Sequence, residues 1–314
     1  MIRSLDVHLY VTPRCNLSCP HCYYDALDRG RQPPDILELD DIARILNGIC
    51  GRFDADISLE GGEPFLRAGL GAMLATLDAS VLGRITLTTN GTVRIAAPTT
   101  TLAQLGDLRL SIDGHTDDLQ QELRGIAVGP VLATCAKLRS AQVPHTVRMT
   151  LYRRNVRLLE EIYGWVQAHN IARLSLFEYQ ASGRGIDQEP VFGVGSEDID
   201  HLLADLVRLP RPAGLELLTL NLAQRRVEAV LAQEEALSTA DVTVRRLPQN
   251  ANCTVNYDGS VGVSPWTVTA HGSPDVFTYT DSPDFLERVE NAAAAGALQD
   301  QGPCISRVQL RCER

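Results

Sequence analysis

The sequence has almost no lysine. Lys137 is the only lysine among 29 basic side chains, and it lies in a segment with helical spacing. Enzymes that use pyridoxal phosphate hold it as a Schiff base with a lysine side chain. The scarcity of lysine therefore argues against pyridoxal-dependent chemistry, such as that of an aminomutase.

Long apolar runs and an export signal are also missing. No run approaches the ~20 residues that a membrane-spanning helix needs. The first residues, Met-Ile-Arg-Ser-Leu-Asp, lead directly into an apolar run and lack the regions of a signal peptide. The net charge of −10 argues against non-specific nucleic-acid binding, which needs clustered cations. We expect a cytoplasmic protein with no membrane partner and no nucleic-acid partner.

The eight cysteines favour a metal over disulfides. A chain of 314 residues with 44% hydrophobic residues can bury a large core and does not need disulfides for stability. Three of the cysteines are clustered at close spacing, which is typical of reduced thiols that bind a metal. Cys50 and Cys135 lie on or beside apolar stripes, so we expect them to be small core residues.

The first half of the chain alternates between short β-branched runs and segments of helical spacing. Ile42, Ile45, Leu46 and Ile49, for example, follow the spacing of one helix face. Strands that alternate with helices predict a parallel sheet covered by helices. Six such units predict an α/β fold, a partial (β/α)6 TIM-like barrel with its chemistry at the carboxyl ends of the strands. The predicted strands are Val7–Val11, Ile57–Leu59, Ile85–Thr89, Leu108–Ile112, Thr146–Leu151 and Leu174–Phe177.

The second half predicts a smaller α+β extension. A polar, glycine-rich loop over 178–197 ends the barrel, so we place the barrel at residues 1–195 and the extension at 196–314. The dipeptide Asp258-Gly259 predicts a tight hairpin turn. Within the extension we expect helices near 196–208, 222–235 and 284–295, a strand near 215–220 and a hairpin over 254–263.

Cys15, Cys19 and Cys22 form the most informative motif, directly after the first predicted strand. Three thiolates on one loop can bind three irons of a cubane and leave the fourth iron open to a ligand. The alternatives are a structural zinc site or a ferredoxin-like loop. Zinc sites usually pair such cysteines with a second pair elsewhere, and ferredoxin loops favour two-residue gaps.

Further polar motifs follow the next three strands. Glu60-Gly61-Gly62-Glu63-Pro64 follows the second strand, and glycines allow backbone to approach a ligand while a carboxylate can receive an ammonium group. Asn90 and Gly91 follow the third strand, and the fourth ends in Ser111-Ile112-Asp113-Gly114. Each motif alone is also explained by an ordinary turn. Their joint order on consecutive strand ends is the stronger observation.

These motifs together resemble those of the radical S-adenosylmethionine (SAM) superfamily, in the branch that often carries a SPASM or twitch extension. The resemblance covers roughly residues 5–180 and implies a [4Fe–4S] cluster on Cys15, Cys19 and Cys22. It implies that Gly61, Gly62 and Glu63 hold the amino group of SAM. It further implies that Asn90, Ser111 and Asp113 line the SAM pocket and that the ring of His21 packs on adenine. Tyr23 is a weaker candidate for such a contact.

Two interpretations remain open for several arginines near these motifs. Arg124, Arg148, Arg153 and Arg184 could pair with a carboxylate of SAM or of a substrate. Solvated surface is the default expectation for each of them.

The carboxyl-terminal cysteines depart from the pattern of that branch. Ser264 stands where a SPASM or twitch hairpin normally has a cluster-binding cysteine, so the extension resembles a degenerate one. Cys253, Cys304 and Cys312 are a candidate ligand set for an auxiliary iron–sulfur cluster. An extension that only caps the barrel is the alternative. A third reading makes Cys304 or Cys312 a hydrogen-atom donor to a substrate radical.

The resemblance leaves three functions open. The first is a radical SAM enzyme that abstracts a hydrogen atom from a peptide or natural-product intermediate. The second is a radical SAM dehydrogenase or epimerase of a small polar metabolite, such as a sugar or cyclitol. The third is a non-catalytic iron–sulfur or zinc module.

The resemblance also implies partners. The electron that reduces the cluster would come from an external donor such as a flavodoxin or ferredoxin. Because the predicted cluster strand lies so near residue 1, we expect no built-in leader-peptide-binding or cobalamin-binding domain before it. A separate protein would then bind any leader peptide.

Overall fold

The computed structural model describes residues 4–27, 35–246, 250–262, 264, 270, 277–279, 284–294 and 305–313. Residue 263 of the predicted hairpin, residue 295 of the last predicted helix and Cys304 lie outside these ranges. In the described part, no helix is both long and apolar enough to cross a membrane.

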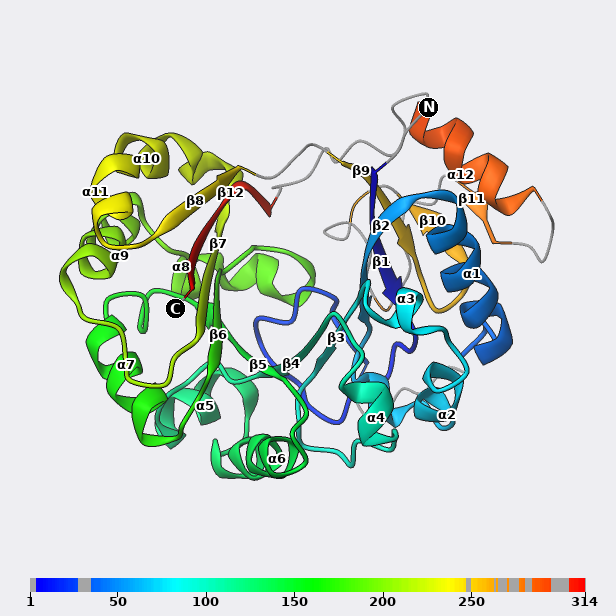
Figure 1. Cartoon of the computed structure of the whole chain (residues 1–314), viewed down its shortest axis with the longest axis horizontal. Coiled ribbons are helices and arrows are strands. Elements are labelled where there is room, and N and C mark those ends of the chain that lie inside the picture. Colours follow the sequence, from blue (N-terminus) through cyan, green and yellow to red (C-terminus); the bar gives the residue numbers. More distant parts are fainter. Residues whose placement is uncertain are drawn as a thin grey trace.

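The described strands form one twelve-stranded sheet that curves into an open horseshoe (Figure 1). All six predicted strands are confirmed, and they pair in parallel in chain order. They are β1 (Ser4–Tyr10), β2 (Asp54–Glu60), β3 (Ile85–Thr89), β4 (Asp107–Ser111), β5 (Thr146–Leu151) and β6 (Arg173–Glu178). Two further strands extend the parallel run, with β7 (Leu217–Ala223) beside β6 and β9 (Ala251–Val255) beside β1.

Helices cover the convex face of this sheet, as Figure 1 shows. The predicted stripe of Ile42, Ile45, Leu46 and Ile49 is buried on α1 and packs against the strands. The helix predicted over 196–208 is α9. The helices are α1 (Leu39–Arg52), α2 (Leu70–Leu74), α3 (Ala79–Leu82), α4 (Thr99–Leu102), α5 (Asp117–Arg124), α6 (Gly129–Ser140), α7 (Leu159–Ala168), α8 (Glu189–Phe192), α9 (Ser196–Arg208), α10 (Val227–Ala232), α11 (Glu234–Thr239) and α12 (Phe285–Ala294), with 3-10 turns at Pro64–Leu66, Gly183–Gln188 and Gln224–Arg226.

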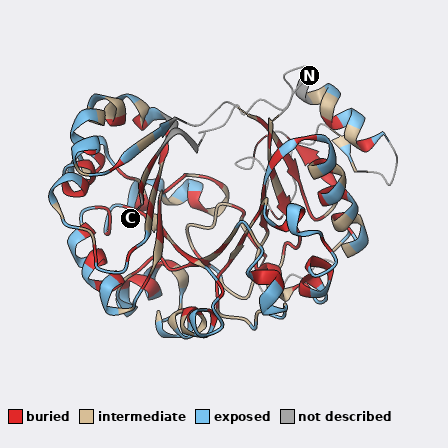
Figure 2. Cartoon of the chain, viewed as in Figure 1, coloured by how far each residue is buried: buried red, intermediate tan, exposed pale blue. Residues whose placement is uncertain are grey.

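The two faces of the sheet differ in polarity because successive side chains of a strand point to opposite faces. On β5, Val147, Met149 and Leu151 are buried in the apolar core under the helices. Arg148 and Thr150 alternate with them and face the inside of the horseshoe. The buried residues accordingly follow the strands in Figure 2. The concave face is therefore the polar one, where a site can form.

The predicted extension does not form a separate layer but continues the barrel sheet at both edges. Beyond β6 the order is β7, β12 (Ile305–Glu313) and β8 (Thr243–Arg246), with antiparallel pairing of β12. Beyond β1 it is β9, β10 (Ser260–Gly262) and β11 (Phe277–Thr278). The strand expected near 215–220 is thus a further parallel strand of the barrel sheet. The helix expected over 222–235 is shorter, because β7 runs on to Ala223.

The hairpin of β9 and β10 is confirmed, and it connects to the first loop of the chain. Only Gly259 of the predicted Asp-Gly turn has a positive φ, of 86°, and its N–H donates to the carbonyl of Asn256. The Asn256 side chain is fully buried and accepts a hydrogen bond of 2.7 Å from the Tyr24 hydroxyl. Tyr24 also stacks on Tyr10 with ring centres 4.4 Å apart. Segments far apart in sequence are tied together at this point.

Replacing Asn256 with alanine should lower the free energy of unfolding by about 1–3 kcal/mol, because the buried Tyr24 hydroxyl loses its acceptor. Urea unfolding measures this change. Asn252→Ala on β9, the strand that directly precedes Asn256, is the matched control and should cost less, since Asn252 is only half-buried. Equal costs for the two variants would contradict the role given to the Tyr24 hydrogen bond.

Candidate active site

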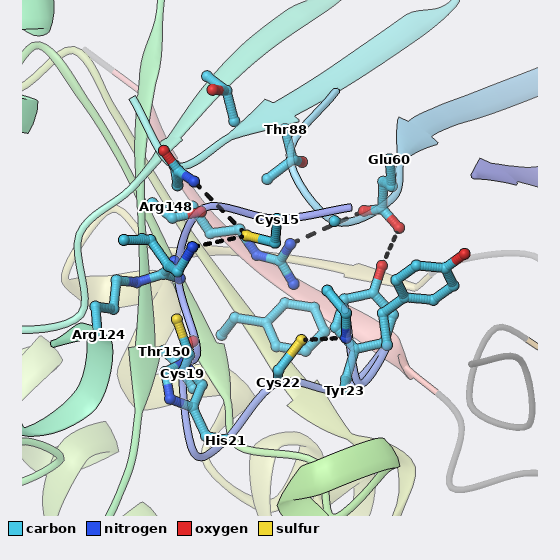
Figure 3. A pocket seen from close by; sticks show the side chains of 18 of the residues that line it. Cys15, Cys19, His21, Cys22, Tyr23, Glu60, Thr88, Arg124, Arg148 and Thr150 are labelled. Carbon is cyan, nitrogen blue, oxygen red and sulfur yellow. Dashed lines mark hydrogen bonds and ion pairs between the residues drawn. The ribbon is translucent and has the colours of Figure 1, made fainter. Parts of the chain in front are cut away.

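One cavity opens at the carboxyl ends of β1 to β6, where a parallel barrel gathers its ligand groups. It encloses about 960 Å³ of empty space, including the part open to solvent. Its walls come from the loop after β1 and from the ends of the following strands, as Figure 3 shows. They include Cys15, Cys19, His21, Cys22, Tyr23, Glu60, Gly61, Gly62, Thr88, Asn90, Ser111, Arg124, Arg148, Thr150, Phe177, Glu178, Tyr179 and Gln180.

The loop that carries the three cysteines is held in shape by its own backbone and by Arg184. The Cys15 N–H donates to the carbonyl of Leu27, and the Leu27 N–H donates to that of Pro13, each at 2.9 Å. Arg184 donates to the carbonyls of Cys19 and Ala26 at 3.1 and 2.7 Å. The default expectation of solvated surface is therefore wrong for Arg184. It clamps the cysteine loop from the segment after β6.

The three thiols share the cavity wall but differ in their neighbours. Cys15 accepts a hydrogen bond of 3.4 Å from the Leu17 N–H, and Cys22 accepts one of 3.4 Å from Ala26. Burial raises the pKa of Cys15 to about 12 and that of Cys19 to about 11. Binding of these sulfurs to metal therefore releases protons, as for any thiol ligand.

Gly61 and Gly62 lie where only glycine fits. A Cβ on Gly62 would lie 2.1 Å from the carbonyl oxygen of Arg14, and one on Gly61 would lie 2.5 Å from that of Thr12. Gly61 also has a φ of 143°, which side chains rarely adopt. The close approach seen here is between this turn and the start of the cysteine loop. Contact of the same glycines with SAM stays a prediction.

Glu63 is fully buried and is not among the residues that line the cavity. Its carboxylate accepts hydrogen bonds of 2.7 Å from the Thr89 hydroxyl, 2.7 Å from the Asn90 N–H and 3.1 Å from the Phe65 N–H. Burial raises its pKa although these bonds oppose the shift. The carboxylate thus joins the turn after β2 to the end of β3. Its predicted role as acceptor of the SAM amino group is not tested by this arrangement.

Asn90 and Ser111 both line the cavity, and their contact with SAM stays a prediction. The Asn90 side-chain amide donates to the Asn16 carbonyl oxygen at 2.8 Å and lies 3.9 Å from the sulfur of Cys15. Asn90 therefore connects the end of β3 to the cysteine loop.

Asp113 lies beneath the cavity wall and organises three groups around it. It is fully buried, with His21 Nε2 at 3.0 Å, Arg124 Nε at 2.6 Å and the Thr150 N–H at 2.7 Å. Burial alone would raise its pKa, but Arg124 and His21 outweigh burial and hold the pKa well below the usual range. Asp113 itself is not among the cavity-lining residues, so it orients His21 and Arg124.

A mixed polar and aromatic wall faces the cysteines. The Tyr23 hydroxyl donates to Glu60, which also has His8 Nδ1 at 3.4 Å. Arg148 lies 4.0 Å from Glu60, and its guanidinium lies over the Phe177 ring at 4.5 Å. Burial would raise the pKa of Glu60, but His8, Arg148 and Tyr23 outweigh it and lower the pKa to about 2. Glu60 is therefore a carboxylate at neutral pH.

This wall was only partly found from sequence. The default expectation that Arg124 and Arg148 lie on the solvated surface is wrong, because both line the cavity. Arg153 is exposed, as expected by default. The alternation of polar and apolar residues along β2 and β5 could have identified Glu60 and Arg148. Both lie at polar positions of strands whose alternate residues are apolar, so their side chains point away from the apolar core.

The carboxyl-terminal cysteines are not brought together. Cys253 is fully buried on β9 opposite Val7 of β1, and burial raises its pKa to about 12. Cys312 is buried on β12 opposite Leu218 of β7. In the sheet order β9 and β12 are separated by all of β1 to β7, so Cys253 and Cys312 cannot bind one cluster in this arrangement. Cys312 does not line the cavity either, which argues against hydrogen-atom donation by it. The predictions for Cys304 lie outside the described residues.

The donor set of the cavity fits the cofactors that the sequence pattern implies. Soft thiols are the ligands that iron–sulfur clusters use. No three Cys, His, Asp or Glu side chains of the described ranges converge on a point where one ion could bind. A cubane does not require that, because each thiolate binds a different iron. Buried polar atoms without a partner, His21 Nδ1 and Thr88 Oγ1, belong to residues of the same cavity and are available to a polar ligand.

Replacing Cys253 and Cys312 with alanine, singly or together, should leave the iron content of the anaerobically reconstituted protein unchanged. Each change should lower the free energy of unfolding by roughly 1 kcal/mol, because it removes a packed core atom. Iron assay and denaturant unfolding measure the two effects. Cys19→Ala is the matched control and should lose iron. Loss of iron from the double core variant would show that one of these thiols is a ligand after all.

Replacing Glu63 with alanine should destabilise the fold, because it leaves buried donors of Thr89, Asn90 and Phe65 without an acceptor, at about 1–3 kcal/mol for each donor that stays unpaired. Glu63→Gln keeps one acceptor oxygen and should retain part of that stability. Unfolding and SAM titration are measured on both variants. Wild-type stability combined with lost SAM affinity in the alanine variant would instead show direct contact between the carboxylate and SAM.

Curated proteins that are similar in sequence to this chain include a cyclase and a peptide maturation protein. GTP 3′,8-cyclase of Synechococcus sp. (strain WH7803) is 29% identical over 248 residues, which are 76% of this chain and 62% of the cyclase. The sporulation killing factor maturation protein SkfB of Bacillus subtilis (strain 168) is 29% identical over 158 residues, 49% of this chain and 37% of SkfB. The chain thus spans less than two thirds of the length of these curated relatives.

Solved structures show the same fold. Streptococcus suis SuiB bound to its precursor peptide SuiA covers 96% of this chain and 66% of SuiB, with a TM-score of 0.60 and 16% identity. SuiB has also been solved bound to SAM. The family model for the radical SAM superfamily matches residues 9–166, which include the cysteine loop and the ends of β2 to β5. The chain therefore belongs to the radical SAM superfamily, whose cofactors are a [4Fe–4S] cluster and SAM.

Proposed function

We propose that this radical SAM enzyme abstracts a hydrogen atom from a peptide, as one step in the maturation of that peptide. When bound, the reduced cluster supplies the electron that cleaves SAM, and SAM supplies the 5′-deoxyadenosyl radical. The single observation that carries the proposal is the shared cavity. The three thiols line it together with charged, amide and aromatic side chains.

The wall opposite the thiols suits an amide-rich substrate. Gln180 is buried, and its side-chain carbonyl oxygen has no partner among the described residues, so it can accept a peptide N–H. Glu60 adds a carboxylate and Arg148 a cation, and a peptide offers partners for both. The buried Gln180 oxygen is costly unless a ligand satisfies it.

Phe177 completes this wall with an apolar surface. Its ring also packs on the Arg148 guanidinium, which limits where that cation can move. A bound side chain would then meet a fixed ring and a fixed charge. The expected substrate segment thus combines an apolar group with backbone amides.

Relatives support peptide modification without being decisive about this chain. SkfB is named as a maturation protein, and SuiB has been solved with a precursor peptide. By analogy, an external electron donor such as flavodoxin or ferredoxin and a separate leader-peptide-binding protein are proposed partners.

A second candidate is a small polar metabolite that is anionic. The observation that favours it is the pair of cations Arg124 and Arg148 on the cavity wall. A relative named for a reaction of GTP is consistent with it. Sugars and cyclitols fall into the same class of small polar substrate.

The test begins with anaerobically reconstituted protein, SAM and a strong reductant. We expect formation of 5′-deoxyadenosine, which chromatography and mass spectrometry quantify. The triple variant Cys15→Ala, Cys19→Ala, Cys22→Ala should lack both the cluster and this product, because no ligands remain to bind the irons.

Substrate class is tested by adding short precursor peptides encoded beside the gene, or polar metabolites, and by recording product mass. A peptide that becomes lighter by two hydrogens, or that gains a cross-link, supports the proposal. Turnover of a metabolite with no change in any peptide would replace the first candidate with the second. Glu60→Gln should keep 5′-deoxyadenosine formation in the absence of substrate while lowering peptide turnover, because the amide oxygen can still accept from Tyr23 but the charge is lost.

A further inference from the structure

Arg124 is placed by the ends of a short helix. Thr116 caps the start of α5 by accepting the Leu119 N–H, and Gly125 ends the helix with a φ of 70°. Arg124 is therefore the last helical residue. Its side chain turns into the cavity, where its Nε donates to Asp113 at 2.6 Å. Figure 3 shows it on the side of the cavity that carries the sulfurs of Cys15 and Cys19.

The three thiols differ in what balances their charge. Cys15 and Cys22 each accept a backbone N–H, whereas no N–H reaches the sulfur of Cys19 in the described part of the chain. Arg124 and Cys19 line the same cavity, and the anion that pairs with Arg124 is Asp113. The guanidinium of Arg184 donates to the backbone carbonyl of Cys19 at 3.1 Å.

We propose that Arg124, held in place by Asp113, is the counter-charge that sets the reduction potential of the [4Fe–4S] cluster, chiefly at the corner bound by Cys19. A cation close to a cluster favours the form that carries one more electron. The low exposure of the site strengthens this effect, because little water screens the charges. The proposal rests on the cluster of the family and not on the substrate, so it can fail while the proposed function stands.

The position of Asp113 makes the sign of the effect testable. Asp113 is an anion in the same buried group, and its other contacts are His21 and the Thr150 N–H. Removal of the cation should make the cluster harder to reduce, and removal of the anion should make it easier. A salt bridge that only stabilises the fold would not shift the two variants in opposite directions.

The experiment uses anaerobically reconstituted full-length protein without SAM, poised at one fixed potential with mediators. Electron paramagnetic resonance quantifies the reduced cluster. Arg124→Gln should lower the ratio of reduced to oxidised cluster about tenfold, which corresponds to about 59 mV for a one-electron couple. Arg124→Lys keeps the charge and should keep most of the wild-type ratio. Asp113→Asn should raise the ratio.

Arg154→Gln is the matched control. Arg154 is an exposed arginine paired with Glu122, so this variant changes the net charge equally without touching the cavity, and its ratio should equal that of the wild type. An unchanged ratio in Arg124→Gln with normal iron content overturns the proposal. If Arg124→Gln does not hold iron, the test depends on Asp113→Asn. The proposal is then overturned if the ratio of reduced to oxidised cluster in Asp113→Asn is equal to or below that of the wild type. If neither variant holds iron, the pair is a folding element and the proposal is rejected.

Discussion

Two backbone hydrogen bonds hold the whole active site in register. The N–H groups of Gly62 and Glu63 donate to the carbonyls of Thr12 and Arg14 at 2.9 and 2.8 Å. Only a residue without a side chain allows this contact, because a Cβ at Gly62 would overlap Arg14. The contact determines where the cysteine loop leaves the sheet, and hence which strand ends its thiols face.

The cavity next to this contact is lined by charged side chains, which are uncommon inside a barrel. Closed barrels fill their interior with packed apolar layers. Here the open sheet leaves room, and the carboxylates of Asp113 and Glu60 both have partners, Arg124 for Asp113 and His8 and Tyr23 for Glu60. Pairing removes most of the penalty for burying charge, and it also fixes the orientation of the side chains. Polar groups are thus in place before any ligand arrives, which is what electrostatic preorganisation requires.

Sequence reasoning found what depends on local pattern and missed what depends on distant contacts. The strands β3 and β5 and the helix α9 were predicted to the residue, because apolar periodicity and turn residues mark them locally. Arg184 clamps carbonyls some 160 residues earlier in the chain, as its hydrogen bonds with Cys19 and Ala26 show, and no spacing in the sequence reveals that. Cys253 was misread because cysteine is both a ligand and a small core residue. Its alternation with Ala251 and Val255 was the signal of a buried strand.

The same geometry separates the chemistry from the choice of substrate. Glu60 directly precedes the Gly61-Gly62 turn, so strand parity points its side chain into the cavity whatever residue stands there. Arg148 and Phe177 also line the cavity from β5 and β6, where Phe177 pairs with Thr150, two residues after Arg148. None of these three side chains makes a hydrogen bond to the cysteine loop apart from that of Glu60 with Tyr23. Substitutions on this wall should therefore leave the thiols, Asn90 and Asp113 in their places, so the group of residues around the cysteines does not depend on the identity of these three side chains.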